Sequence, residues 1–209
     1  ALLLLVYLIH AVAERQGNIN VDVVTDALRN SDQRIMGPRY MTAGMGDGGA
    51  CHPRDNIALR YMAEKLDLGY ELFDSIMNAR EVQAKNMANT IIHFAKLNSM
   101  PVVIHGKAYK PNVPYEEGSY SKLVGHYVQN AGVNNVNYVD PQTDDYYKPE
   151  GPCVFLLAHS AEITYEYTGK THQDKLYCDI PAGSVVIDPW RKFKKDDVTV
   201  IHYGNTRGM

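Results

Sequence analysis

A single cysteine stands at the end of a glycine-rich stretch, where it could act as a nucleophile. The stretch reads Gly44-Met45-Gly46-Asp47-Gly48-Gly49-Ala50-Cys51-His52-Pro53-Arg54-Asp55. Its glycines let the backbone approach a ligand closely, and Pro53 predicts that a helix begins near Cys51. The amide groups and dipole of that helix N-terminus would favour a thiolate. Asp55 follows four residues later, on the same helical face, where it could act as a base.

Other interpretations of this stretch must be weighed. Gly44, Gly46 and Gly49 formally give GxGxxG, but that dinucleotide fingerprint follows a strand, and the residues before it have a helical pattern. A metal site at Cys51 is not supported, because the chain has no CxxC or HxxxH pattern that would supply further ligands. We therefore predict no metal. An inert cysteine and an ordinary first-turn Asp55 remain alternatives, since lone cysteines are usually small buried residues.

The composition is that of a globular protein of nearly balanced charge. Of its 209 residues 45% are hydrophobic, and the formal net charge of -3 gives no basic field for a nucleic acid or an anionic membrane. The three cysteines are far apart, which excludes a disulfide framework and predicts a cytoplasmic protein. The apolar run 2–9 is well short of a span of roughly 20 residues. The chain begins inside this run without Met, so we expect it to be a piece of a longer protein.

The hydrophobic pattern changes at about residue 98. Before it, helical periodicity covers four stretches, 2–16, 21–28, 55–66 and 70–97. After it, a helix is predicted over 119–130, and five apolar runs predict strands at 102–104, 136–139, 154–158, 185–187 and 198–202. The expected fold class is α/β, with an all-helical segment (1–98) followed by a Rossmann-like domain (99–209) built on a mostly parallel sheet.

Three short stretches, Asp32–Ile35, Gly48–Asp55 and Gly106–Asn112, together resemble motifs of the UDP-glucose/GDP-mannose dehydrogenase family. The residues from Gly48 to Asp55 resemble its GGSC-x-x-KD active-site motif. Asp32-Gln33-Arg34-Ile35 resembles the DxRIG segment that lies shortly before the cysteine in that family. Gly106-Lys107-Ala108-Tyr109-Lys110-Pro111-Asn112 resembles the G-x-A-[FY]-K-x-[ND] stretch that opens its sugar-nucleotide domain. The motifs keep the family's order and spacing from residue 1 to about 119, and the likeness is weaker beyond.

The resemblance implies that a sugar C6 alcohol is oxidised to a carboxylate by two hydride transfers to NAD. Cys51 would add to the C6 aldehyde to give a thiohemiacetal, from which the second transfer makes a thioester that water hydrolyses. Asp55 would position that water or act as base, and Arg54 would contact the cofactor. The expected substrate is UDP-glucose, with UDP-N-acetylmannosamine and GDP-mannose as alternatives.

The resemblance also implies which residues bind the substrate. Tyr109 would stack near the base or ribose, while Lys110 and Arg191 would neutralise the diphosphate or sugar. Gly48 would offer backbone contacts. Arg34 would reach the neighbouring subunit's site, because the family's homodimer is built on its central helices.

The chain departs from the family pattern in several places. Glu117-Gly118-Ser119 replaces an Arg-Glu-Ser, Asp47 replaces an aromatic residue, and Asp188-Pro189-Trp190-Arg191 replaces a DGRR-like run. The family's NAD-binding domain and its catalytic Lys and Asn precede the part that this chain resembles. We therefore expect a C-terminal part that has no dehydrogenase activity by itself, NAD being bound mainly by the missing domain. A non-catalytic sugar-nucleotide-binding or dimerisation module and a helical scaffold remain alternatives.

Overall fold

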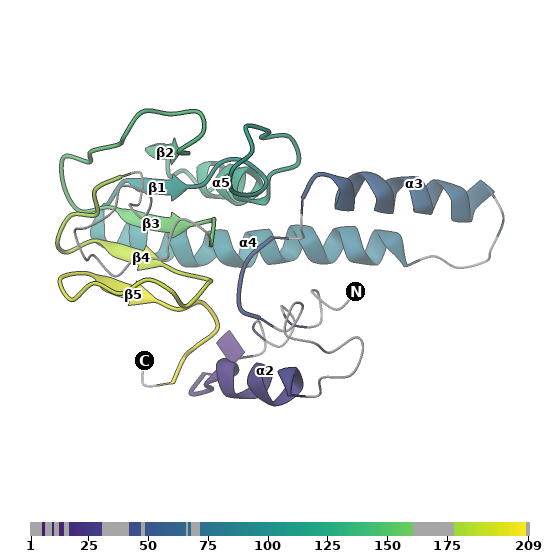
Figure 1. Ribbon diagram of the computed structural model, residues 1–209, viewed down its shortest axis with the longest axis horizontal. Coiled ribbons are helices and arrows are strands. Elements are labelled where there is room, and N and C mark those ends of the chain that lie inside the picture. The colour runs from purple at the N-terminus through teal and green to yellow at the C-terminus, as the bar shows by residue number, and fades with distance from the viewer. Residues whose placement is uncertain are drawn as a thin grey trace.

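The helical part of the chain precedes the sheet, as the hydrophobic pattern predicts (Figure 1). The computed structural model describes residues 6, 10, 13–14, 17–30, 42–46, 49–65, 67, 72–160 and 178–207. Its first helices are α2 (Val21–Arg29), α3 (Cys51–Lys65) and α4 (Phe73–Asn98). The helical pattern over 55–66 starts too late for α3, which begins at Cys51 itself. Most of the helix expected over 2–16 lies outside the described residues.

Five strands form one parallel sheet, which confirms the predicted Rossmann-like α/β class. They are β1 (Val102–His105), β2 (Val136–Val139), β3 (Val154–Leu157), β4 (Val185–Ile187) and β5 (Thr199–Ile201), with α5 (Tyr120–Asn130) between β1 and β2. The strand order is β2-β1-β3-β4-β5, and every neighbouring pair is parallel. Each predicted strand is therefore present, and the helix predicted over 119–130 is α5.

The two faces of the sheet are covered differently. Side chains alternate along each strand, so Val102 and Ile104 face one way and Val103 the other. The first face packs against α4 and α5 in a hydrophobic core. The second face is covered by residues from the connections between strands, including Ile180 and Phe193. The three central strands, β1, β3 and β4, are therefore buried on both faces, which explains their continuous apolar sequences.

Helix α4 belongs to both parts of the molecule. From its middle onwards it contributes Ala84, Ala88, Ile91 and Ala95 to the core on the first face of the sheet. Its first half runs antiparallel to α3, which projects away from the sheet (Figure 1). The helix ends at Ser99, whose left-handed backbone (φ 51°) turns the chain into β1. Among the described residues, no helix is long and apolar enough to cross a bilayer.

Candidate functional site

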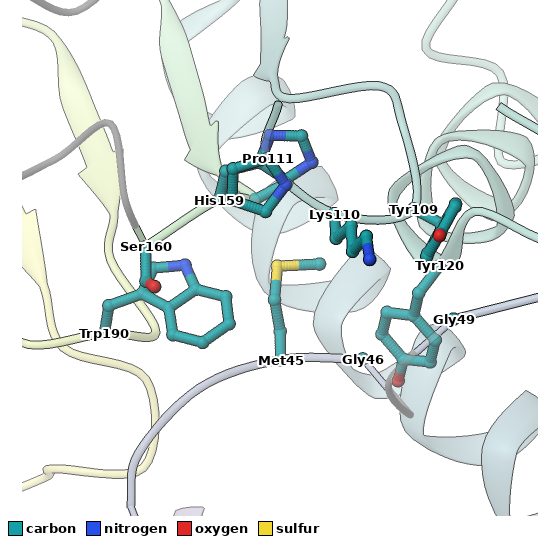
Figure 2. A pocket seen from close by; sticks show the side chains of 11 residues that line it. Met45, Gly46, Gly49, Tyr109, Lys110, Pro111, Tyr120, His159, Ser160 and Trp190 are labelled. Carbon is teal, nitrogen blue, oxygen red and sulfur yellow. The ribbon is translucent and has the colours of Figure 1, made fainter. Parts of the chain in front are cut away.

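The strand order creates a crevice at the carboxyl ends of β1 and β3. The chain leaves β1 towards β2 at one edge, whereas β3 leads to β4 on the other side. Open parallel sheets bind ligands where the connections diverge in this way. A cavity of about 170 Å³, here called the switch-point cavity, lies at this position (Figure 2). Its lining consists of Met45, Gly46, Gly49, Tyr109, Lys110, Pro111, Tyr120, Ala158, His159, Ser160 and Trp190.

A buried carboxylate fixes the loop that follows β1. Asp140, directly after β2, is 1% exposed, and its Oδ2 accepts the backbone N–H groups of Lys107 and Ala108, both at 2.9 Å. Its Oδ1 accepts the N–H of Gln142 at 3.0 Å. From the other side, the His159 ring lies 2.9 Å from the carbonyl oxygen of Ala108. These bonds hold the loop that carries Tyr109 and Lys110 in one conformation.

The two lysines of this loop have different environments. Lys107 Nζ lies 2.7 Å from Asp144 and 3.3 Å from Glu116. Partial burial opposes its charge, but these two carboxylates raise the pKa of Lys107 above its usual value. Lys110 is exposed, lines the switch-point cavity, and lies over the Tyr109 ring at 5.3 Å. Lys107 therefore braces the loop, and Lys110 presents a cation to the cavity.

The glycines of the 44–49 stretch allow it to pack on aromatic rings of the sheet domain. A Cβ atom on Gly49 would lie 2.5 Å from the Tyr109 ring, and one on Gly44 would lie 2.5 Å from the Trp190 ring. Such approaches exclude any side chain. The sequence had suggested that these glycines let the backbone approach a ligand; at Gly44 and Gly49 the close neighbour in the structure is a ring. The stretch is thus fixed along the cavity.

Cys51 is the first residue of α3 and is exposed. Ala50, just before it, rests on Gly118, where a Cβ atom would lie 2.8 Å from the Ala50 Cα. Gly118 has φ +70°, and its lack of a side chain permits the close contact. Two glycine contacts therefore connect the cysteine to the sheet domain, one through Gly49 and Tyr109 and one through Gly118.

Asp55 and Arg54 are both exposed and pair with each other. Arg54 Nε donates to Asp55 Oδ1 at 2.7 Å. This hydrogen bond lowers the pKa of Asp55 below its usual value, so the carboxyl is ionised at neutral pH. The two residues are neighbours of Cys51 in α3 but do not line the switch-point cavity.

Arg191 lies apart from Tyr109 and Lys110. Its guanidinium donates to Asp22 at 2.8 Å, to the carbonyl of Pro189 at 2.7 Å and to that of Tyr203 at 2.5 Å. It lines an adjoining cavity of about 340 Å³ between α2 and the loop after β4, bordered also by Trp190. In this structure Arg191 connects α2 to the sheet.

Several features that the sequence analysis considered do not take part in the contacts described above. Arg34 and Gly48 lie outside the described residues, as does Asp47. Within the described part of the chain, no group of three or more potential ligands could hold a metal ion. There the residues do not form the strand, glycine turn and helix that bind a dinucleotide, since α5 begins only at Tyr120, well after β1. The described residues therefore do not form the phosphate-binding turn of a dinucleotide-binding domain.

Sequence reasoning missed the roles of four residues, Asp140, Asp188, His159 and Trp190. Asp188 is fully buried and accepts the N–H groups of Trp190, Lys192 and Phe193, so it shapes the loop after β4 as Asp140 shapes the loop after β1. One signal could have found both acids, because each directly follows an apolar strand. No comparable signal marks His159, since its role depends on the register of β1 and β3.

Comparisons with known proteins give consistent results. Residues 5–82 match the family model described as "UDP-glucose/GDP-mannose dehydrogenase family, central domain". The mouse (Mus musculus) UDP-glucose 6-dehydrogenase is 27% identical over 202 residues, which cover 93% of this chain and 39% of that protein. The chain thus spans well under half the length of this curated relative.

Two solved structures share the fold along nearly the whole chain. A UDP-glucose dehydrogenase from Pyrobaculum islandicum has a TM-score of 0.63 at 19% identity, covering 98% of this chain and 48% of that one. A UDP-D-ManNAc dehydrogenase from Pyrococcus horikoshii has a TM-score of 0.66 at 18% identity, covering 98% and 49%. At these identities the likeness concerns the fold alone.

Proposed function

Because the chain belongs to the UDP-glucose/GDP-mannose dehydrogenase family, we propose that it is the C-terminal part of an NAD-dependent nucleotide-sugar 6-dehydrogenase. It supplies the catalytic cysteine and the sugar-nucleotide-binding domain. The observation that carries this proposal is the packing of Gly49 on Tyr109, which joins the cysteine stretch to the loop that presents Lys110. We propose UDP-glucose as the substrate, because the similar proteins include UDP-glucose dehydrogenases from mouse and Pyrobaculum islandicum.

The switch-point cavity would hold the diphosphate end of the nucleotide. Lys110 would neutralise a phosphate, and Tyr109 would offer its ring edge beside the ribose. At about 170 Å³, the cavity is smaller than the roughly 300–1,000 Å³ of sites that enclose a whole ligand. A nucleotide sugar would therefore extend beyond it in two directions, with the sugar towards Cys51.

The exposed thiol of Cys51 would form a C–S bond with the C6 aldehyde carbon, and the aldehyde oxygen would take up a proton to give a thiohemiacetal. The ionised Asp55 would position water for the later hydrolysis. NAD, the hydride acceptor, would be bound mainly by a domain outside this chain, with Arg54 as a contact from this side. The three cysteines are free, which fits the cytoplasmic location that we propose.

We also propose a homodimer through the helical segment, 1–98, with 99–209 as the sugar-nucleotide-binding domain. On α3, Ile57 and Tyr61 are one turn apart and are 52% and 55% exposed. Leu59 on the same helix is 49% exposed. An apolar helix surface of this kind is typical of an interface. Arg34 would reach the partner's site from this segment, and Gly48 would contact the substrate through its backbone.

Calorimetric titration of the chain with UDP-glucose, UDP and NAD tests the proposal. UDP-glucose and UDP should bind, and NAD should not. Lys110→Ala should weaken the binding of both uridine nucleotides at least about tenfold, the effect of losing a charge-assisted contact of about 1.5–3 kcal/mol. Lys148→Ala, at an exposed lysine outside the cavity lining, is the matched control. Absence of UDP binding, or equal binding by the Lys110→Ala variant, would contradict the proposal.

A further inference from the structure

Trp190 is the chain's single tryptophan and is fixed at the carboxyl edge of the sheet. Its backbone N–H donates to Asp188 Oδ1 at 2.9 Å, and its indole Nε1 donates to the carbonyl of Leu157 at 2.8 Å. The ring therefore spans the ends of β3 and β4. Gly44 packs against part of it, and the side chain remains partly exposed. An aromatic ring held in this way is a preorganised surface.

The site residues follow one another in an order that runs from Cys51 past Lys110 and places Trp190 at the far end. Cys51 directly follows the Gly49–Ala50 contacts, and Gly49 packs on Tyr109. Figure 2 shows Tyr109 and Lys110 on one side of the lining and Trp190 on the other, with Met45 between them. A nucleotide sugar is linear, in the order sugar, diphosphate, ribose and base. With the sugar at Cys51 and the diphosphate at Lys110, the base points to Trp190.

The two aromatic candidates for stacking differ in how much of each ring is available. Gly49 lies against the Tyr109 ring, and the ammonium of Lys110 lies 5.3 Å from the centre of that ring. Trp190 instead borders both the switch-point cavity and the adjoining cavity of about 340 Å³. Space for a base therefore exists beside the indole, whereas Tyr109 is engaged by its neighbours. Ser160, which lines both cavities, offers a hydroxyl next to the indole for a base edge.

On the premise of the proposed function, we propose that Trp190 is the residue on which the nucleobase stacks. Arginine occupies the corresponding place in the DGRR-like run that the resemblance implies, so an indole here replaces charge with an apolar face. Base stacking on an aromatic side chain contributes about one to two orders of magnitude in affinity. Affinity for the uridine part of the ligand then depends on Trp190, and affinity for the diphosphate depends on Lys110.

Fluorescence of the lone tryptophan tests this directly. UDP should quench the Trp190 emission with the same midpoint as its calorimetric binding curve. Inorganic pyrophosphate should bind with little change in that emission, because it has no base to stack. If UDP binds by calorimetry and requires Lys110 but leaves the emission unchanged, the stacking role is overturned while the proposed function stands. If UDP does not bind, both are overturned.

Two variants separate stacking from a structural role. Trp190→Leu should weaken UDP binding about tenfold to a hundredfold and leave pyrophosphate binding unchanged, which also reports that the variant is folded. Trp190→Phe keeps an aromatic face and should retain most of the UDP affinity. An equal loss of UDP and pyrophosphate affinity in Trp190→Leu, or no loss of either, would overturn the proposal.

Discussion

The two longest described helices differ in how completely the chain covers them. In α4, Ala84, Ala88 and Ile91 have no exposed surface, because the sheet and α5 pack on them. In α3, Ala63 is the single residue among the described side chains that is classed as buried. The part of α4 that faces the sheet is therefore covered by other described residues. The half that begins with Cys51 instead leaves most of α3 exposed, including the apolar side chains of Ile57 and Tyr61.

The thiols follow the same division. Cys51 is exposed at the start of α3, whereas Cys153 and Cys178 are 1% and 3% exposed in the core on the second face of the sheet. Burial raises the pKa of the Cys153 thiol and raises that of Cys178 to about 12. At neutral pH the two buried thiols are protonated and inaccessible. Reactivity towards an alkylating reagent should therefore be confined to the α3 side.

The largest expected effect on stability comes from comparing the same substitution, isoleucine to alanine, in each of the two helices separately. Ile91→Ala removes a fully buried side chain and should lower the free energy of unfolding by about 2–5 kcal/mol. Ile57→Ala, at a side chain that is 52% exposed, should change it by less than about 0.5 kcal/mol when the chain is monomeric. Urea denaturation at low protein concentration measures both. Equal effects would mean that α3 is buried within the monomer.

A smaller loss of stability is expected when Asp140, whose carboxylate fixes the loop after β1, is replaced. Asp140→Asn replaces one acceptor oxygen with an amide that faces backbone N–H groups. Leaving a buried donor unpaired should cost about 1–3 kcal/mol of stability. The same change should weaken UDP binding, because the loop carrying Lys110 is displaced. Asp145→Asn, at an exposed carboxylate nearby, is the control for both readouts. Unchanged UDP affinity in Asp140→Asn would show that Asp140 does not position Lys110 for binding.

The smallest expected effect is a pH dependence of the free energy of unfolding, which comes from Cys178 in the sheet domain. Folding raises the pKa of Cys178 from 9.0 to about 12, so the folded state holds this proton more tightly. The stability that this adds is complete below about pH 9 and is lost as the pH rises towards about 12, at up to about 1.4 kcal/mol per pH unit. Urea midpoints measured from pH 7 to 10 should fall less steeply for Cys178→Ala than for the parent chain.

The sequence predicted the fold well because the central strands β1, β3 and β4 are buried on both faces. Five apolar runs gave all five strands, and their parallel arrangement followed from the alternation with helices. The motif around Cys51 gave the start of α3 approximately. These features depend on the order of neighbouring residues, so one amino-acid sequence is enough to detect them.

The site was harder to predict because its contacts join distant residues. Nothing local shows that His159 meets the loop after β1, or that Gly118 lies against Ala50. Trp190 was noted as a departure from a motif, and its place between two cavities depends on the strand order. Arg191 was expected beside the substrate, and the structure gives it three partners from α2 and the strand ends.

The central claim is that Cys51 and the switch-point cavity belong to one site. Its most direct test is the rate at which iodoacetamide alkylates Cys51, followed by mass spectrometry with and without saturating nucleotide. Cys51 should be alkylated in the free chain while Cys153 and Cys178 are not. UDP-glucose should slow the reaction severalfold and UDP should slow it less, because the sugar extends from Lys110 towards the thiol. An alkylation rate at Cys51 that saturating UDP-glucose leaves unchanged would contradict the account.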